Sequence, residues 1–395
     1  MMAQTIREIF TRDFILSVLA YFTFVISFHL LTPTLPIYLS RLGSKETEIG
    51  VLVGIFFVSS LVFRPFVGKA LLKIPERTFM ITGALLFAIT SITYLWAPPF
   101  WPLLIVRVFQ GIGLAVMHTA SFTLIANIGP VAHRGQSLGY FYLAPTVALA
   151  LAPSFGMVLI NHFGFTPLFL VCSGISLCSL LFSRKMERRQ VAPMGTASMK
   201  DGFFISWKAL PSSISIFFIQ IIWGALIAFF PLYAINLGVV NPGLFFTAIA
   251  IMLISGRVLG GKILDLYSRE RVILSFLITH VISMSILFFS KSLPMFILVG
   301  AIWGVGSAFV VPALMAYTLD RAGPPLGPAI ATFTAISDLG VAVGPVIMGI
   351  MIRVTSYPTM FLCLVLTSFI NFNYFYFFVR QKRGPFHIHI PSKNS

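Results

Sequence analysis

The chain has 395 residues, of which 58% are hydrophobic and only 10% charged, and its formal net charge is +16. A soluble globular domain carries about 25% charged residues, so this composition excludes a chain that faces water over its whole surface. The basic residues stand at the ends of long apolar segments, where anionic lipid headgroups attract them, and do not form a patch suited to nucleic acid. The composition indicates an integral membrane protein that binds the lipid bilayer and no nucleic acid.

Twelve apolar segments follow one another along the chain, each near or above the roughly 20 residues that a helix needs to cross a bilayer. They cover residues 14–39, 49–70, 78–97, 101–127, 136–160, 165–183, 213–238, 244–266, 272–290, 294–319, 328–352 and 357–379. No cleavable signal peptide is evident, because the first segment is too long for a signal core. We therefore expect an all-α membrane protein with twelve transmembrane helices.

Lys and Arg are divided unequally between the two ends of these segments. Of the 27 basic residues, 20 fall on one predicted side and 4 on the other. Since loops rich in Lys and Arg remain in the cytoplasm, this bias places both termini there. We expect an N-terminal six-helix bundle over 1–183, a cytoplasmic linker over 184–212 and a C-terminal six-helix bundle over 213–395 with a short basic tail. The short loops are typical of a bacterial inner-membrane protein.

The two halves of the chain repeat one another. Four pairs of segments match in order at offsets of 192 to 195 residues: LPIYLSRLG with FPLYAINLG, RPFVGKALL with RVLGGKILD, QGIG with WGVG, and Ala-Pro with Gly-Pro. A duplicated six-helix unit is the architecture of many transporters, whose substrate site lies at the interface between the repeats. The repeat predicts two pseudo-symmetric bundles around a central site.

A basic loop with a glycine follows the second apolar segment of each half. In the second half, GKILDLYSRER and the arginine before it supply Arg257, Gly261, Asp265, Arg269 and Arg271. The first half, GKALLKIPER with its preceding arginine, keeps only Arg64, Gly68 and Arg77. Leu72 stands where the acid is found in the other copy. We expect the glycines to let neighbouring helices approach closely.

The fourth segment contains RVFQGIGLA, with Arg107 about two turns inside the predicted helix. A charge at that depth is costly and usually faces a cavity. Helical spacing puts Gln110 and His118 on the same face. His118 could titrate near neutral pH, so we take it as a candidate for proton coupling. The alternative is a packing arginine that bonds to carbonyl groups of a neighbouring helix.

The fifth and eleventh segments each place small residues around a proline. The fifth has Ala152, Pro153 and Gly156, and the eleventh has Gly344 and Pro345. Small residues before a proline permit a kink and close packing of helices. Both segments are therefore predicted to bend and to pack tightly.

These three motifs resemble those of the major facilitator superfamily, and the resemblance covers nearly the whole chain. It implies a major facilitator fold that works by alternating access, with charge contacts of the two basic loops holding closed states. Because the first loop lacks its acid, we expect the second loop, centred on Asp265, Arg257 and Arg269, to dominate gating. The alternative is that these charges only set topology. The pattern at Pro153 and Gly156 resembles exporters. The resemblance also implies that Arg107 is a candidate for proton coupling or for binding substrate charge.

The resemblance also implies that the first, fourth, seventh and tenth helices line a central cavity. The substrate-cavity candidates on them are His29, Thr34, Gln110, Gln220, Trp223, Trp303 and Tyr317. Such a cavity is amphipathic, with few charges. It suits a lipophilic or mildly polar solute better than a sugar.

Asp338 is the single acidic residue placed well inside a predicted helix, about ten residues into the eleventh segment. An ionisable group at membrane depth is by default a hypothesis for a functional site. We take Asp338 as a candidate proton carrier. The alternative is a carboxylate that bonds to a neighbouring helix.

We interpret the chain as a proton-coupled exporter of a small amphipathic solute such as a drug, siderophore or metabolite. An importer or uniporter of a small nutrient on the same fold, and a non-transporting membrane receptor or scaffold, are the alternatives. The sequence contains no P-loop, so we do not expect an enzyme. We expect no metal, because the three cysteines lack ligand spacing, and we expect no cofactor and a monomer.

Overall fold

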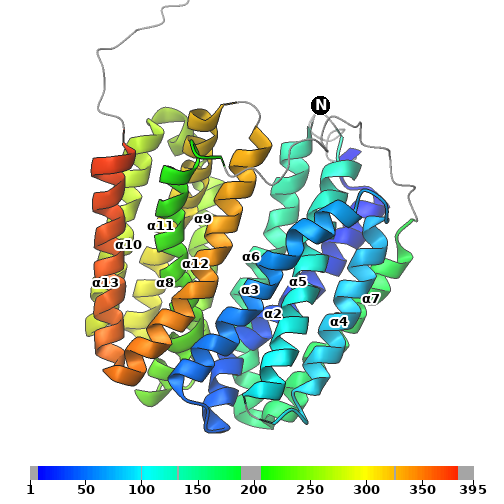
Figure 1. Cartoon of the computed structure of the whole chain (residues 1–395), viewed down its shortest axis with the longest axis horizontal. Helices are drawn as coiled ribbons and strands as arrows, with labels where there is room; N and C mark the ends of the chain where they lie inside the picture. Colours follow the sequence, from blue (N-terminus) through cyan, green and yellow to red (C-terminus); the bar gives the residue numbers. More distant parts are fainter. Residues whose placement is uncertain (1–7, 99, 131–132, 188–205, 324–325, 381–395) are drawn as a thin grey trace, which may run out of the picture.

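The structure is a computed structural model, and it describes residues 8–98, 100–130, 133–187, 206–323 and 326–380 (Figure 1). Inside helices, the side chains of residues 134–135 and 258–265 lie outside this description. Within the described ranges the chain forms twelve long helices and no strand. The twelve predicted segments are therefore confirmed as helices.

The helices of the two halves follow in chain order. The first six are α2 (Arg12–Arg41), α3 (Glu46–Ala70), α4 (Glu76–Thr93), α5 (Trp101–Ile128), α6 (Arg134–Phe163) and α7 (Phe165–Lys185). The second six are α8 (Leu210–Asn236), α9 (Gly243–Leu266), α10 (Arg269–Phe289), α11 (Leu293–Ala322), α12 (Leu326–Val354) and α13 (Tyr357–Tyr374). The last predicted segment ends differently, because after Tyr374 it continues as a π-helix, η3 (Phe375–Val379).

Proline and glycine mark where several helices begin and end. A proline occupies the first turn of α5, α8, α11 and α13, where its missing N–H breaks no helical hydrogen bond. Gly164 between α6 and α7 has φ of 81°, and Gly323 after α11 has φ of 65°. Glycine is the residue that adopts this left-handed conformation without steric cost, so both positions stop a helix sharply.

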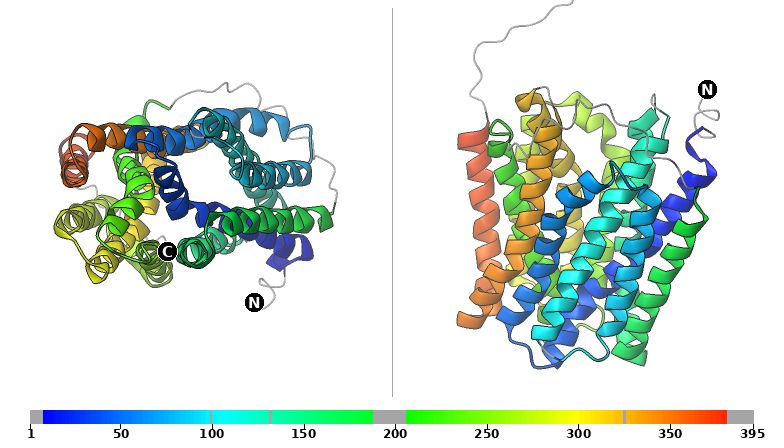
Figure 2. Two further views of the ribbon diagram at one scale, coloured as in Figure 1. Left: turned by 90° about the horizontal axis from the view of Figure 1, so that it is seen from below. Right: turned by 45° about the vertical axis from the view of Figure 1, so that its right-hand side comes forward.

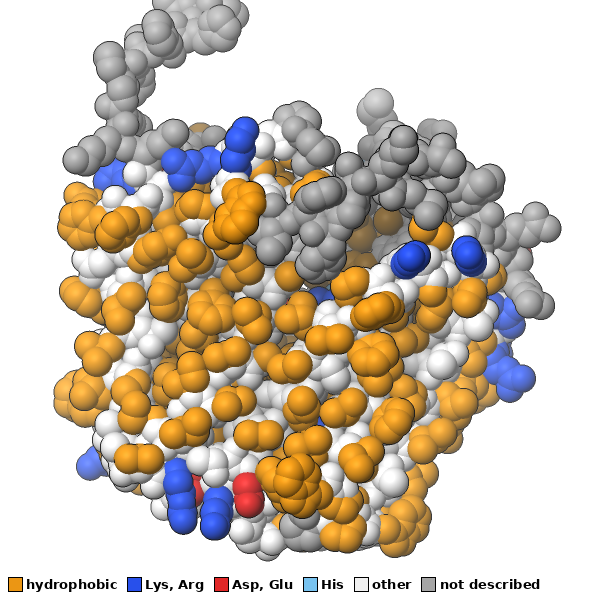
Figure 3. Space-filling view, in the orientation of Figure 1, with side chains coloured by type: hydrophobic (Ala, Val, Ile, Leu, Met, Phe, Trp, Pro, Cys, Tyr) orange, Lys and Arg blue, Asp and Glu red, His pale blue; other side chains and the backbone are white. Residues whose placement is uncertain are grey.

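The protein is a multi-pass membrane protein. Ten of the described helices are long and apolar enough to cross a bilayer, and α4 and α9 complete the twelve. Figure 3 shows hydrophobic side chains covering the middle of the molecule, with Lys and Arg toward its two ends. We call the end where α2 begins the basic end, because Lys69, Lys73, Arg77, Arg184 and Arg380 lie there.

The helices pack as two groups of six (Figures 1 and 2). In the first group α2 packs against α6 and α7, and α5 packs against α3 and α4. In the second group α8 packs against α12, and α11 packs against α9 and α10. The groups meet mainly through two helix pairs, α3 with α12 and α6 with α9, and less extensively through α2 with α8.

The two main interfaces between the halves are built alike. A side chain at Gly50 of α3 would collide with the backbone of Pro345 in α12, and one at Gly243 of α9 would collide with the backbone of Pro153 in α6. Each residue of the first pair stands 192 or 193 positions from its counterpart in the second. The predicted internal repeat is thus visible in the contacts, and both interfaces close tightly at the end opposite the basic end.

Candidate functional site between the two halves

Arg64 and Asp338 form an ion pair across the two halves. Arg64 lies on α3 and Asp338 on α12, and the guanidinium donates a hydrogen bond to the carboxylate. Their side chains are 26% and 22% exposed, so they are neither sealed in the core nor freely solvated. Arg64 was predicted to belong to a loop motif and Asp338 to carry a proton, and the structure joins the two residues.

This ion pair lies where α3 and α12 separate. Nearer the opposite end, Gly54 faces the backbone of Ala342. From there to Arg64 is ten residues of α3, about 15 Å of helix, whereas from Ala342 to Asp338 is four residues of α12, about 6 Å. The long arginine side chain therefore reaches back to Asp338, and the two helices spread apart toward the basic end (Figure 1).

His118 and Tyr21 form a polar contact between α5 and α2. The Tyr21 hydroxyl and His118 Nδ1 are 2.7 Å apart. Of the predicted proton-coupling candidates, Asp338 pairs with Arg64 and His118 is bonded to Tyr21.

Arg257 occupies the equivalent place at the other interface between the halves. Its Nη1 lies 3.3 Å from Thr146 Oγ1, which joins α9 to α6. The Thr146 hydroxyl in turn donates to the carbonyl of Tyr142, one turn earlier on α6, at 2.9 Å. Arg257 was predicted as a gating residue, and Thr146 and Tyr142 were not singled out in the sequence at all. The repeat offset was the signal that could have found Thr146.

Arg107 has the packing arrangement that was left open as its alternative. It is 5% exposed, its Nε donates to the carbonyl of Leu52 at 2.9 Å, and its Nη1 donates to Gln110 Oε1 at 2.7 Å. The guanidinium also stacks 4.2 Å from the ring centre of Phe56. Tyr94 donates to the same Gln110 oxygen at 2.7 Å. In this conformation Arg107 holds α5 to α3.

The remaining cavity candidates divide between the central region and the helix cores. A pocket between α2, α3, α5 and α8 is lined by Phe28, Leu31, Thr32, Leu35, Pro36, Val53, Phe57, Arg107 and Ile227. His29 Nδ1 lies 3.4 Å from the hydroxyl of Thr32, at the edge of this pocket. Thr34 is buried and bonds to the carbonyl of Leu30, so it packs inside α2.

The candidates of the second half contribute mostly to packing within that half. Gln220 donates to the hydroxyl of Ser337 at 2.9 Å, and Trp223 packs edge-on against Phe246. Trp303 is 1% exposed, with its ring centre 4.1 Å from that of His280. The Tyr317 hydroxyl donates to the carbonyl of Val379 at the basic end. Trp303 and Tyr317 therefore do not line an open cavity in this conformation.

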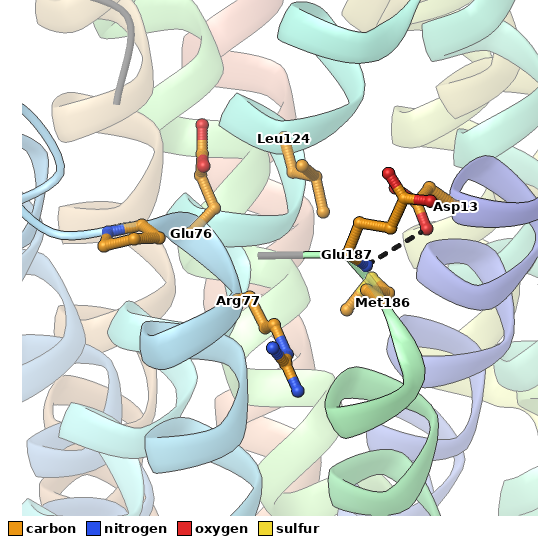
Figure 4. A pocket seen from close by; sticks show the side chains of 7 residues that line it. Asp13, Glu76, Arg77, Leu124, Met186 and Glu187 are labelled. Carbon is orange, nitrogen blue, oxygen red and sulfur yellow. Dashed lines mark hydrogen bonds between the residues drawn. The ribbon is translucent and has the colours of Figure 1, made fainter. Parts of the chain in front are cut away.

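The first basic loop makes its contacts within the first half. Figure 4 shows Glu76 and Arg77 of this loop lining a small pocket with Asp13, Leu124, Met186 and Glu187. Arg77 donates to the carbonyl oxygens of Ser183 and Arg184 at the end of α7. Glu76 accepts a hydrogen bond from Asn127 at 2.7 Å. A side chain at Gly68 would meet no described atom within 4 Å. The prediction that this glycine lets two helices approach closely was therefore wrong.

The second basic loop also connects helices of its own half. Arg269 forms an ion pair of 2.7 Å with Asp320 at the end of α11, and Glu270 lies 3.7 Å from Arg380. The surroundings of Gly261 and the side chain of Asp265 lie outside the described residues, and Arg271 is exposed. Arg257 and Arg269 contact different partners, so the described part of the predicted gating motif is not one cluster.

The small residues around the prolines mark close packing, as their pattern predicts. A side chain at Gly156 would approach the carbonyl of Leu30 to 2.8 Å, and one at Gly344 would collide with the backbone of Ile221. Pro153 and Pro345 lie inside α6 and α12. Gly156 therefore brings α6 close to α2, and Gly344 brings α12 close to α8.

The family model described as Major Facilitator Superfamily matches residues 17–256 and 212–394. The chain belongs to this superfamily. Among curated relatives it is 24% identical over 342 residues to the staphylopine export protein of Staphylococcus aureus strain Mu50, covering 81% of this chain and 84% of that protein. It is 22% identical over 339 residues to the quinolone resistance protein NorA of Staphylococcus aureus strain MSSA476, with the same coverage.

Solved structures of other superfamily members have the same fold. The crystal structure of a point mutant of the nucleoside transporter NupG matches with a TM-score of 0.78 at 13% identity, covering 93% of this chain and 99% of that one. A bacterial homologue of the human lysosomal transporter Spinster, inward-facing and unoccupied, matches with a TM-score of 0.72 at 16% identity, covering 92% and 95%. This major facilitator protein is thus a membrane transporter of small molecules and not an enzyme.

Proposed function

We propose that this transporter is a proton-coupled exporter of a small amphipathic solute, and that Asp338 carries the proton. The observation behind the proposal is the ion pair of Asp338 with Arg64, which joins the two halves at membrane depth. A carboxylate placed there can be neutralised by one proton. Neutralisation removes a contact between the halves, so protonation and conformation are coupled.

In the proposed cycle the present conformation awaits solute with Asp338 ionised and held by Arg64. The basic end faces the cytoplasm, in keeping with the excess of Lys and Arg there. After the halves rock to face outward, Asp338 takes a proton from the outside and the solute leaves. On return, Arg64 pairs again with Asp338 and displaces the proton into the cytoplasm.

The direction of transport rests on the relatives and on the fifth-helix motif. One relative is named as an export protein and another as a quinolone resistance protein. Pro153 and Gly156 keep the small-residue and proline pattern that resembles exporters, and Gly156 packs α6 against α2. Export is therefore the direction that we propose.

The test uses inverted membrane vesicles that contain the full chain and an imposed proton gradient, acidic inside. The probe is the fluorescent quinolone norfloxacin. We expect wild-type vesicles to accumulate it and Asp338→Asn vesicles to lose accumulation, because an amide cannot exchange a proton. Asp320→Asn is the matched control, since that carboxylate pairs with Arg269 at the exposed end of α11. Equal accumulation by Asp338→Asn, or uptake only when the gradient is reversed, would reject the proposal.

A further inference from the structure

The internal repeat relates the Arg64–Asp338 pair to a second pair in which a hydroxyl replaces the acid. Arg257 stands 193 positions after Arg64, and Asp338 stands 192 positions after Thr146. Both arginines reach across an interface between the halves, and each bonds to the residue at the matching position. At one interface that residue is a carboxylate, and at the other it is a hydroxyl.

The equivalence extends along both interfaces. Gly54 of α3 faces the carbonyl of Ala342, and Thr247, which stands 193 positions later, donates to the carbonyl of Ala150 at 2.6 Å. Ala150 in turn stands 192 positions before Ala342. Arg257 and Thr146 are therefore placed by the same backbone geometry as Arg64 and Asp338, and the missing carboxylate is a difference of side chain alone.

Arg257 is a cation that meets a neutral partner across the interface. Among the described residues, no carboxylate lies within 4 Å of its guanidinium, and its hydrogen bond is to the Thr146 hydroxyl at 3.3 Å. The side chain is exposed, although it lies between the halves of a membrane protein. A charge at such depth is costly unless an opposite charge accompanies it.

We propose that Arg257 binds the carboxylate of the transported solute, and that the substrates are amphipathic organic carboxylates. A solute carboxylate takes the place that Asp338 fills at the other interface, so that each arginine then holds one carboxylate. Arginine suits this role because its planar group donates two parallel hydrogen bonds to a carboxylate. The inference deepens the proposed function, on which it rests for the identity of the site as the transport site.

Aromatic side chains beside this position fit the apolar part of such a solute. The Phe122 ring centre lies 4.9 Å from that of Tyr142 and 4.4 Å from that of His118. Tyr142 is 46% exposed and lies one helical turn before Thr146, whose hydroxyl donates to the Tyr142 carbonyl at 2.9 Å. Aromatic rings thus lie near the position that Arg257 contacts, which matches an amphipathic anion.

The experiment measures thermal stabilisation of the purified full chain by three probes of one shape: 2-naphthoate, its neutral amide, and the cationic 2-naphthylmethylammonium. A ligand that binds only the folded state raises the unfolding temperature by mass action. We expect naphthoate to stabilise the wild type more strongly than the other two. We expect Arg257→Gln to bind naphthoate about ten to a hundred times more weakly, and Arg257→Lys to recover part of the affinity.

Thr146→Asp gives the sharper test, because it supplies the absent acid from within the chain. This variant is expected to fold, since the new carboxylate would pair with Arg257 as Asp338 pairs with Arg64, but to lose naphthoate binding. Arg353→Gln, at the far end of α12, is the matched control and should bind as the wild type does. The unfolding temperature of each variant without probe shows whether it has folded.

The proposal is overturned if no probe stabilises the wild type, if the amide or the cation binds as well as naphthoate, or if folded Arg257→Gln binds naphthoate normally. Equal stabilisation by chloride or phosphate would assign the position to an inorganic anion and also overturn it. Carboxylate binding that depends on Arg257 in a chain without proton-linked transport would reject the proposed function and retain this inference. Proton-linked transport of neutral solutes alone would retain the proposed function and reject this inference.

Discussion

At the scale of single residues, the same side chain type serves different purposes at different depths. Arg107 is buried, donates to Leu52 and Gln110, and stacks on Phe56. Arg64 and Arg257 remain partly exposed, and each reaches a residue of the opposite half. The motif in the fourth helix strongly resembles that of the superfamily. The arginines that connect the halves nevertheless lie on α3 and α9.

The contacts of Arg107 predict a structural role. Arg107→Lys should lower the free energy of unfolding by about 1–3 kcal/mol, because one ammonium cannot reproduce hydrogen bonds to two acceptors and the stack on Phe56. Thermal unfolding of the purified chain measures this, with Arg353→Lys as the exposed control. An unchanged unfolding temperature together with loss of proton-linked transport would instead assign Arg107 to coupling.

At the scale of helices, the contact of α3 with α12 depends on glycine at one end and on charge nearer the other. Gly50 and Gly54 let the backbones meet at Pro345 and Ala342. Toward the basic end the arginine of α3 spans the widening gap to Asp338. The α6–α9 pair repeats this design with Gly243 and Arg257, so the two interfaces between the halves have matched contacts.

The close contact at Gly54 predicts that its replacement prevents closure of the opposite end. In Gly54→Leu the new side chain meets the carbonyl of Ala342, and overpacking of this kind costs about 1–3 kcal/mol. A cysteine placed at Thr32, in a background without the native cysteines, should then react faster with an impermeant thiol reagent from that end. Gly68→Leu is the control, since no described atom lies within 4 Å of its added carbon. Equal labelling of the two variants would contradict the prediction.

At the scale of the whole molecule, the described contacts between the halves concentrate at the end opposite the basic end. Asn161 donates to the carbonyl of Val240, and Asn241 donates to the carbonyl of Ser154, both there. Nearer the basic end, Arg64 and Arg257 provide the contacts between the halves. On the proposed transport cycle, this structure is the state closed at the opposite end, and the other state is closed at the basic end.

Loss of the Arg64–Asp338 pair should shift the balance between these two states. Spin labels at Lys69 and Thr334 report the separation of α3 and α12 at the basic end, and labels at Lys45 and Arg353 report the other end. In Asp338→Asn we expect the first distance to shorten and the second to lengthen on average, because the state shown loses a contact that stabilises it. Asp320→Asn should leave both distributions as in the wild type. Unchanged distributions in Asp338→Asn would show that the pair does not bias the equilibrium.

The sequence by itself determined the twelve helices, the two related halves and the excess of basic residues at one end, because apolar length and repeat offsets are local properties of the chain. It also identified Asp338, His118 and the packing glycines Gly156 and Gly344 as positions of interest. Only the tertiary structure decided that Arg64 meets Asp338, that Arg257 meets Thr146, and that Trp303 is sealed within its own half. These contacts depend on the rotation and register of helices far apart in the sequence, and a hydropathy pattern does not fix which face of a buried helix meets which neighbour.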